Sequence, residues 1–131
     1  MRVRTRFVLL LCLLACCGCG QKSTDQLIQD LKAPHEREQI IAVRLLPQRK
    51  SDATKIIPAL IEALKDKSDG VRCSAAIGLG YFGEQAKDAI PALQIARRDS
   101  DVKVREAAGV ALSRIDPKFS NPTQSRPAPG K

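Results

Sequence analysis

The sequence predicts an all-α fold, a short solenoid of about three stacked helical hairpins. Residues 57–72 read IPALIEALKDKSDGVR and residues 90–105 read IPALQIARRDSDVKVR, so identical residues recur at an offset of 33 positions. Within each segment, apolar residues follow the spacing of a helix until an acidic stretch interrupts them. A period of this length is typical of two-helix units that stack on one another.

A fainter first copy precedes these two. Four apolar residues stand where repeat two has Leu60, Leu64, Ala75 and Leu79, namely Leu27, Leu31, Ala42 and Leu46. We therefore expect a repeat domain over residues 25–117, with repeats at about 25–50, 51–84 and 85–117. Three repeats are near the minimum for a stable stack.

The first helix of repeat two is expected over residues 54–65. Its apolar residues fall at positions 56, 57, 60, 61 and 64, which form one stripe of a helix. Ser51 or Asp52 can accept the first free backbone amides as an N-cap. Pro58 removes an amide donor, so we expect this helix to be kinked or to begin irregularly.

The second helix of repeat two follows a turn at residues 66–70, DKSDG. We expect this helix to run from about Asp69 to Tyr81. Its buried face would contain Val71, Ala75, Ala76 and Leu79. The small alanines would let the neighbouring helices approach closely.

The pattern resembles the HEAT repeat, in the short form named for phycobiliprotein lyase subunits. The resemblance covers residues 25–116 and lies in the Ile-Pro-Ala-Leu opening, the acidic turn, Val-Arg, and then Ala-Ala and Leu. It implies a right-handed α-solenoid in which turn acids of one repeat bind an arginine of a neighbour, as a ladder. The matching positions are Asp66, Asp69, Arg72, Asp99, Asp101 and Arg105. Repeat one departs from the pattern, as a terminal cap does, with Ala33, His35 and Gln39 at the equivalent positions.

Residues 78–83, GLGYFG, have the glycine spacing of a dinucleotide-binding loop. That loop needs a buried strand before the glycines, whereas residues 71–77 belong to an expected helix. Repeat three has no glycine at the equivalent positions, which are Ala111, Ser113 and Asp116. We therefore expect no nucleotide, and we assign Gly80 and Gly83 to a helix C-terminus, where positive φ angles are common.

The first fifteen residues, MRVRTRFVLLLCLLA, place three arginines before a short apolar run, as a secretion signal does. Residues 13–16, Leu-Leu-Ala-Cys, resemble the lipobox of bacterial lipoproteins, in which the cysteine, here Cys16, is acylated after the signal is cut off. Cys19 is the alternative acylation site, and an ordinary secretory signal is the alternative interpretation. The resemblance implies an acylated tether over residues 16–24, which anchors the chain in a lipid bilayer.

The location follows from the same resemblance. In lipoproteins an Asp after the acylated cysteine tends to retain the protein at the inner membrane, and no Asp follows Cys16 or Cys19. We therefore expect a cell-envelope protein anchored at the outer membrane and facing the periplasm. At the other end, residues 118–131 hold three prolines and almost no apolar residues, which predicts a disordered tail.

The formal net charge of +8 lies mostly outside the repeats. Seven of the 22 basic residues belong to the signal, tether or tail, which leaves fifteen against fourteen acids, a net charge of +1. Aromatic residues are scarce, with three Phe, one Tyr and no Trp. We therefore expect no nucleic-acid partner, because such a partner requires a basic face and stacking aromatics.

A solenoid binds its partners on the surface that stacking leaves open. A helical wheel directs Ile77 and Tyr81 away from the buried side of repeat two. The second helices line the concave face in HEAT arrays, so the resemblance implies that this face binds a protein or peptide. The expected partner-binding residues are Arg44, Ile77, Tyr81, Val110 and Arg114. The alternative interpretation is that Ile77 and Val110 belong to the core.

The repeats contain no pattern that suggests an enzyme. The one histidine, His35, falls at a turn, and neither an isolated carboxylate pair nor a cluster of metal ligands is present. We expect no catalytic residue, metal or cofactor. Three functions remain open: an anchored protein-interaction scaffold, which we favour; an accessory subunit of an enzyme complex or a bilin-lyase-like binder; and redox sensing through Cys73, Cys17 and Cys19.

Overall fold

The computed structural model describes residues 21–120. They form three helical hairpins, made of α2 (Thr24–Asp30) with α3 (Glu36–Leu45), α4 (Ala53–Ala63) with α5 (Asp69–Phe82), and α6 (Ile90–Ala96) with α7 (Val102–Ile115). Four short 3-10 segments complete the fold: η1 (Leu46–Gln48), η2 (Lys50–Asp52), η3 (Gly83–Ala89) and η4 (Pro117–Ser120). The expected signal peptide, the acylation sites Cys16 and Cys19, and residues 121–131 of the tail lie outside the described residues.

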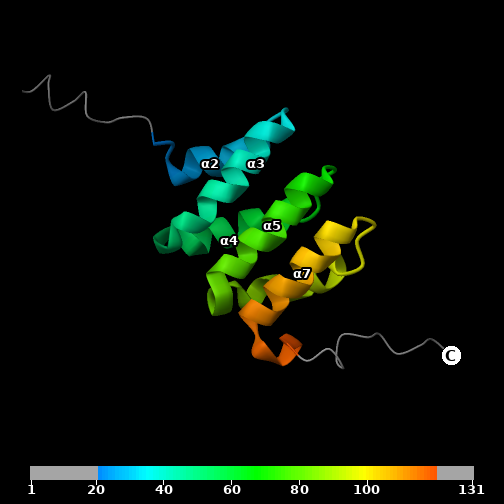
Figure 1. Cartoon of the computed structure of the whole chain (residues 1–131). Coiled ribbons are helices and arrows are strands. Elements are labelled where there is room, and N and C mark those ends of the chain that lie inside the picture. Colours follow the sequence, from blue (N-terminus) through cyan, green and yellow to red (C-terminus); the bar gives the residue numbers. More distant parts are fainter. Residues whose placement is uncertain (1–20, 121–131) are drawn as a thin grey trace, which may run out of the picture.

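The three hairpins stack side by side (Figure 1). The second helices α3, α5 and α7 run next to one another across one face, and α5 contacts both of its neighbours. Residues 21–120 contain no strand, and none of their helices is long and apolar enough to cross a membrane. The predicted all-α solenoid of about three hairpins is confirmed.

One continuous apolar core runs through the three repeats. The expected buried residues of repeat two are fully buried, namely Val71, Ala75, Ala76 and Leu79. The counterparts of three of them in repeat three are fully buried as well, namely Val104, Ala108 and Leu112. Burying a Val or Leu side chain stabilises a fold by about 1.5–3 kcal/mol. The shared register of these residues therefore aligns each repeat with the next one.

The start of α4 differs from the expected capped helix. Neither Ser51 nor Asp52 caps it, because the Asp52 carboxylate accepts a hydrogen bond from the Thr24 hydroxyl in α2 instead. The 3-10 segment η2 gives α4 an irregular beginning, and Pro58 lies inside α4 on its exposed side. Asp52 thus links the first two repeats.

Gly80 and Gly83 have different roles near the end of α5. Gly83 follows the last helical residue with a φ of 55°, as predicted for a helix end. The expectation of a positive φ at Gly80 was wrong, since Gly80 lies within α5 and is buried. A Cβ at Gly80 would stand 3.1 Å from the Cα of Ala111, so glycine is needed there for α5 and α7 to approach.

The fold also extends slightly past residue 117. The segment η4 includes residues 118–120, which the sequence assigned to a disordered tail. Phe119 explains the difference, because its ring packs against the apolar core and holds this turn on the end of α7.

Candidate functional site

A ladder of polar contacts joins the turns of neighbouring repeats. The Arg72 guanidinium donates from Nε and Nη2 to the two carboxylate oxygens of Asp99, at 2.8 and 2.9 Å. Its Nη1 donates to the carbonyls of Asp66 and Lys67, at 2.9 and 3.1 Å. One side chain therefore fixes the turn of its own repeat and the turn of the following repeat.

The Arg72–Asp99 pair is mostly buried, with side chains 15% and 13% exposed. The hydrogen bonds from Arg72 lower the pKa of the Asp99 carboxyl from 3.8 to about 2. The same hydrogen bonds raise the pKa of Arg72. The pair therefore stays ionised throughout the physiological pH range.

Repeat one makes a neutral contact at the equivalent position. Gln39 aligns with Arg72 and is buried, and its amide donates to the Leu31 carbonyl at 2.9 Å and to the Asp66 carboxylate at 3.2 Å. The glutamine thus contacts its own repeat and the next one, as Arg72 does. The departure of repeat one from the arginine pattern does not interrupt the ladder.

Asp69 and Asp101, which the resemblance placed in the ladder, act locally instead. The Asp101 carboxylate caps α7 by accepting from the Val104 amide at 3.0 Å. The Asp69 carboxylate accepts from the Gly70 amide at 2.9 Å, while Ser68 caps α5. Within residues 21–120 neither carboxylate forms a hydrogen bond between repeats, because both lie at the start of a helix.

Two adjoining grooves run along α5 on the face formed by the second helices. One has a volume of about 720 Å³ and is lined mainly by α3 and α5; the other, of about 450 Å³, lies between α5 and α7. All five residues expected to bind a partner line these grooves: Arg44 the first, Val110 and Arg114 the second, and Ile77 and Tyr81 both. Because Cys73 and Lys103 also line both, the two grooves are continuous.

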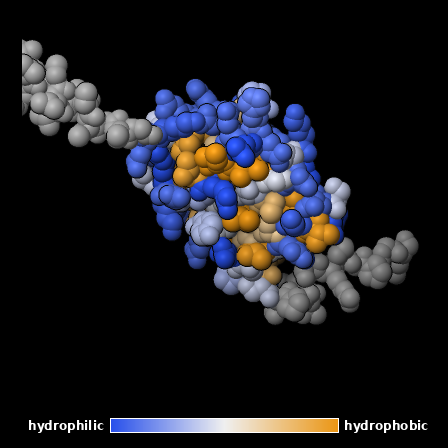
Figure 2. Space-filling view, turned by 45° about the horizontal axis from the view of Figure 1, so that its top comes forward, coloured by the Kyte–Doolittle hydropathy of each residue, from blue (hydrophilic) through white to orange (hydrophobic). Residues whose placement is uncertain are grey.

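The apolar side chains of the grooves are exposed to solvent. Ile77, Tyr81 and Val110 are 45%, 59% and 50% exposed, so the alternative that placed Ile77 and Val110 in the core is wrong. The Arg114 guanidinium lies 5.5 Å from the centre of the Tyr81 ring, within cation–π range. Figure 2 tilts the molecule and shows apolar surface open to solvent among polar residues.

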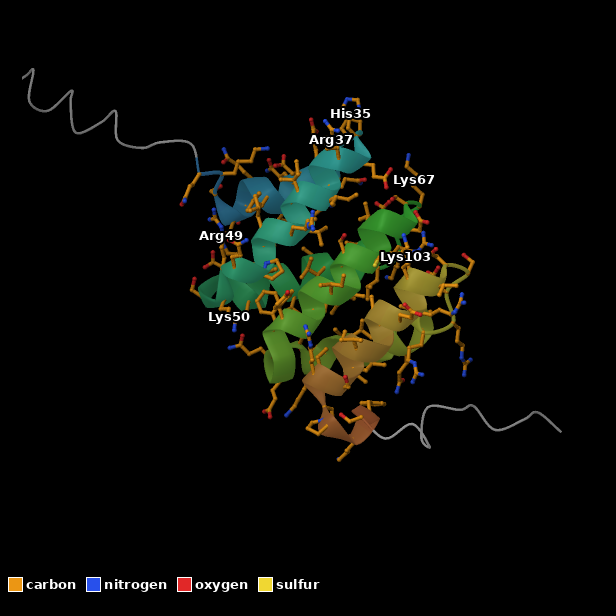
Figure 3. All side chains as sticks on the ribbon, in the orientation of Figure 1. His35, Arg37, Arg49, Lys50, Lys67 and Lys103 are labelled. Carbon is orange, nitrogen blue, oxygen red and sulfur yellow. The ribbon has the colours of Figure 1, made fainter. Side chains whose placement is uncertain are left out.

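The two ends of the grooves differ in charge. Asp69, Asp101 and Glu106 line them near the first turns of α5 and α7, whereas Arg44 and Arg114 line them near the last turns of α3 and α7. Lys103 is a cation at the acidic end, between α5 and α7 (Figure 3). A ligand lying along α5 would thus meet mostly acids at one end and arginines at the other.

Several groove residues were not predicted from the sequence, among them Lys103, Pro47 and Gln48. Lys103 follows Gly70, which also lines the first groove, by 33 positions, so the repeat register contained the signal needed to find it. Pro47 and Gln48 lie in η1, beyond the end of α3, where a helical wheel gives no information.

Cys73 lines both grooves, but its thiol is not activated. Burial raises the pKa of the thiol, which also donates a weak hydrogen bond to the Lys103 carbonyl at 3.7 Å. A thiol that stays protonated reacts slowly, so this environment disfavours redox sensing through Cys73.

Histidine, cysteine and acidic side chains do not gather into a metal site in the described part of the chain. His35 projects from the loop before α3 and is exposed (Figure 3). Within residues 21–120, no group of three or more His, Cys, Asp or Glu side chains is arranged to hold a metal ion.

Comparison with known proteins supports the assignment of the stacked hairpins to a repeat family. The family described as HEAT repeats matches residues 24–117, which include all six helices named above. The chain belongs to the HEAT repeat family. The prediction of HEAT repeats is therefore confirmed, while the lipoprotein signal remains a prediction.

Two proteins are similar to this HEAT repeat chain, and each aligns with it over part of its length. The uncharacterized protein SkfG of Bacillus subtilis (strain 168) is 31% identical over 91 residues, which cover 70% of this chain and 53% of SkfG. A chain in the complex of CpcE and CpcF of phycocyanin lyase from Nostoc sp. PCC7120 matches with 27% identity and a TM-score of 0.66. That match covers 75% of this chain and 39% of the other. The chain thus spans about half the length of the curated relative.

Proposed function

We propose that this HEAT repeat chain is a protein-interaction module that binds a segment of a partner protein along α5. The observation that carries the proposal is the exposure of Ile77, Tyr81 and Val110 within two continuous grooves. Large apolar side chains gathered in a groove gain free energy when a partner removes them from water. The proposal assigns no catalytic step to the chain.

The composition of the grooves supports a protein partner. Tyrosine and arginine are enriched among residues that dominate binding energies, and Tyr81 and Arg114 stand together beside Val110. The opposite charges of the groove ends favour a partner segment with basic residues at one end and acidic residues at the other. An amphipathic helix with such ends, apolar along one side, has the matching chemistry.

We further propose that the module is held at a membrane of the bacterial cell envelope. The arginine-rich start, the apolar run and the lipobox-like residues ending at Cys16 support this proposal. A lipoprotein anchor has more than one acyl chain, which gives stable attachment where a single chain does not. The grooves would then hold a partner near the periplasmic face of the outer membrane.

A small apolar ligand is the second candidate for the grooves. The likeness to a phycocyanin lyase chain favours it, as does the volume of the first groove, about 720 Å³, which lies in the range of small-molecule sites. The chain would then be a bilin-lyase-like binder or an accessory subunit of an enzyme complex.

Crosslinking in intact cells tests the leading proposal with two matched variants. Ile77→Asp puts a charge into both grooves, whereas Ile95→Asp changes a side chain that is 75% exposed on α6 and lines neither groove. We expect Ile77→Asp to lose a crosslinked partner that the wild type and Ile95→Asp retain. If Ile77→Asp is folded and keeps every partner, the groove is not the binding face.

The second candidate has its own readout. A bilin added to the purified protein should co-elute with it in gel filtration and give visible absorbance if the groove binds pigment. Co-elution that Ile77→Asp abolishes would favour the small-ligand alternative over the protein partner. Under the leading proposal we expect no pigment in the protein fraction.

A further inference from the structure

The last contact of the ladder is incomplete. Arg105 aligns with Arg72, and its Nη1 donates to the carbonyls of Asp99 and Ser100, both at 2.8 Å. Arg72 makes the same pair of contacts to its own turn and then holds Asp99 through Nε and Nη2. Within residues 21–120, Nε and Nη2 of Arg105 have no hydrogen-bond partner. The guanidinium is therefore oriented by its own turn, while the edge that binds a carboxylate in Arg72 meets no carboxylate of the described residues.

Val102 lies one helical turn before Arg105, and its exposure shows that residues 21–120 leave this side of α7 uncovered. It is an apolar residue that is 52% exposed. Its counterpart in repeat one, Glu36, accepts a hydrogen bond from the Ser68 hydroxyl of repeat two. This position therefore faces the unit that follows in the stack, and Val102 has no such unit beside it among the described residues.

At two further positions on the same side, repeat three lacks the buried apolar residue that an earlier repeat has. Repeats one and two bury Leu31 and Leu64, but repeat three has the half-buried Arg97 at this position. Gly109 aligns with the fully buried Ala76, and the nearest neighbour that a Cβ at Gly109 would meet among the described residues is Arg97 Nε, at 3.9 Å. We call Arg97, Val102, Arg105 and Gly109 the end face.

The end face is suited to an acidic ligand. It contains two arginines, and the nearby acid on α7, Glu106, is exposed and makes no salt bridge among the described residues. Residues 117–131 include no Asp or Glu, so that segment offers no side-chain carboxylate to Arg105.

We propose that the end face is a second protein-binding surface, which takes an acidic turn between two helices of a partner protein. A carboxylate of that turn is held by Nε and Nη2 of Arg105, in the geometry that Arg72 and Asp99 show within this chain. The partner's turn also covers Val102, and Arg97 adds a second positive charge. None of the four end-face residues lines the grooves, so this surface is independent of the groove proposal.

A second copy of this chain is a poorer occupant than a different protein. In a head-to-tail stack that continued the repeat register, Arg105 would meet Ala33, which aligns with Asp66 and Asp99. Alanine has no carboxylate, so the ladder would not close between copies. Ala33 therefore argues against a second copy as the source of the acid, and the proposal takes the acid from a different protein.

A photo-crosslinking amino acid in place of Val102, in the full chain made in its own cells, tests the proposal. We expect an adduct whose partner peptide contains Asp or Glu and lies in a turn between two helices. Arg105→Gln should lower the adduct yield about tenfold, because the two-pronged charged contact is lost. Arg105→Lys should lower it too, since lysine lacks the planar fork. Arg37→Gln is the matched control and should not lower it, because Arg37 is an exposed residue of α3 that lines neither groove.

A second variant distinguishes loss of binding from loss of folding. Arg105→Gln removes contacts to the turn carbonyls of its own repeat, whereas Arg97→Glu reverses a charge of the end face and leaves Arg105 in place. Both variants should keep a cooperative thermal unfolding transition and lose the adduct. The proposal is overturned by an adduct that folded forms of both variants retain, or by the absence of an adduct. It is equally overturned by adducts only with a second copy or with residues 121–131.

Discussion

Arg72 and Asp99 form a two-pronged ion pair between repeats two and three, with both nitrogen–oxygen distances below 3 Å. Asp99 also accepts a hydrogen bond from the Asp101 amide at 2.9 Å, and Asp101 caps α7. The pair therefore connects the turn of repeat two, the turn of repeat three and the start of α7. Repeats two and three cannot shift against one another without breaking it.

Asp99→Asn should destabilise the protein by about 2–4 kcal/mol, because it leaves the mostly buried Arg72 without a charged partner. The matched control is Asp69→Asn, which lies in the equivalent turn region and forms no hydrogen bond to another repeat within residues 21–120. We expect the control to change the free energy of unfolding by about 0.5 kcal/mol or less. Urea unfolding followed by circular dichroism measures both, and equal losses would show that the pair has no special role.

Acid should weaken the fold in a defined pH window. The pKa of Asp99 is about 2 in the folded protein and 3.8 without its partners, so folding favours the ionised form. This contribution is complete above about pH 4 and is lost as the pH falls through about 2, at a cost of about 1–2 kcal/mol. Urea unfolding at several pH values should show this loss in the wild type, and Asp99→Asn should lack it.

Two glycines inside helices should respond to alanine in opposite ways. In Gly80→Ala, the new Cβ would meet the Ala111 backbone at 3.1 Å, so we expect a loss of about 1–3 kcal/mol. In Gly109→Ala, the nearest neighbour is the flexible Arg97 at 3.9 Å, so helix propensity should dominate and stabilise by about 0.5–1 kcal/mol. The melting temperatures of the two variants test this. A higher melting temperature for Gly80→Ala would contradict the close approach of α5 and α7, and a lower one for Gly109→Ala would contradict the open space at Gly109.

The membrane anchor predicts that cells incorporate labelled palmitate into the protein. Cys16→Ser should abolish incorporation and release the protein from the membrane fraction, whereas Cys19→Ser should leave both unchanged. The reverse pattern would assign the acylation to Cys19. Absence of label in the wild type would remove the lipoprotein interpretation and leave an ordinary secretory signal.

The sequence was sufficient for the fold because its signal is periodic. Val71, Ala75 and Leu79 recur at an offset of 33 as Val104, Ala108 and Leu112, and all six are buried. The errors concern contacts between residues that are distant in sequence. Asp52 bonds to Thr24 instead of capping α4, and Gly80 is a glycine because Ala111 lies against it. Neither partner can be read from the local pattern.

The candidate site was only partly predictable for a related reason. A helical wheel was enough to place Ile77, Tyr81 and Val110 outside the core, because the wheel depends only on helical geometry. It could not show that the grooves on the two sides of α5 are continuous. Gln39 in place of arginine was a departure from the repeat pattern, and only coordinates show that its amide reaches Asp66.

The position of α5 between both grooves has a consequence for any mutational scan of this protein. Four residues line both grooves, namely Cys73, Ile77, Tyr81 and Lys103. A substitution at any of them therefore alters both grooves at once. Only residues confined to one side, such as Gln48 and Val110, can assign a phenotype to a single groove. A molecule bound in one groove also contacts side chains that line the other groove. Two bound molecules would therefore affect one another's affinity, by competition or cooperation, without any change in the backbone.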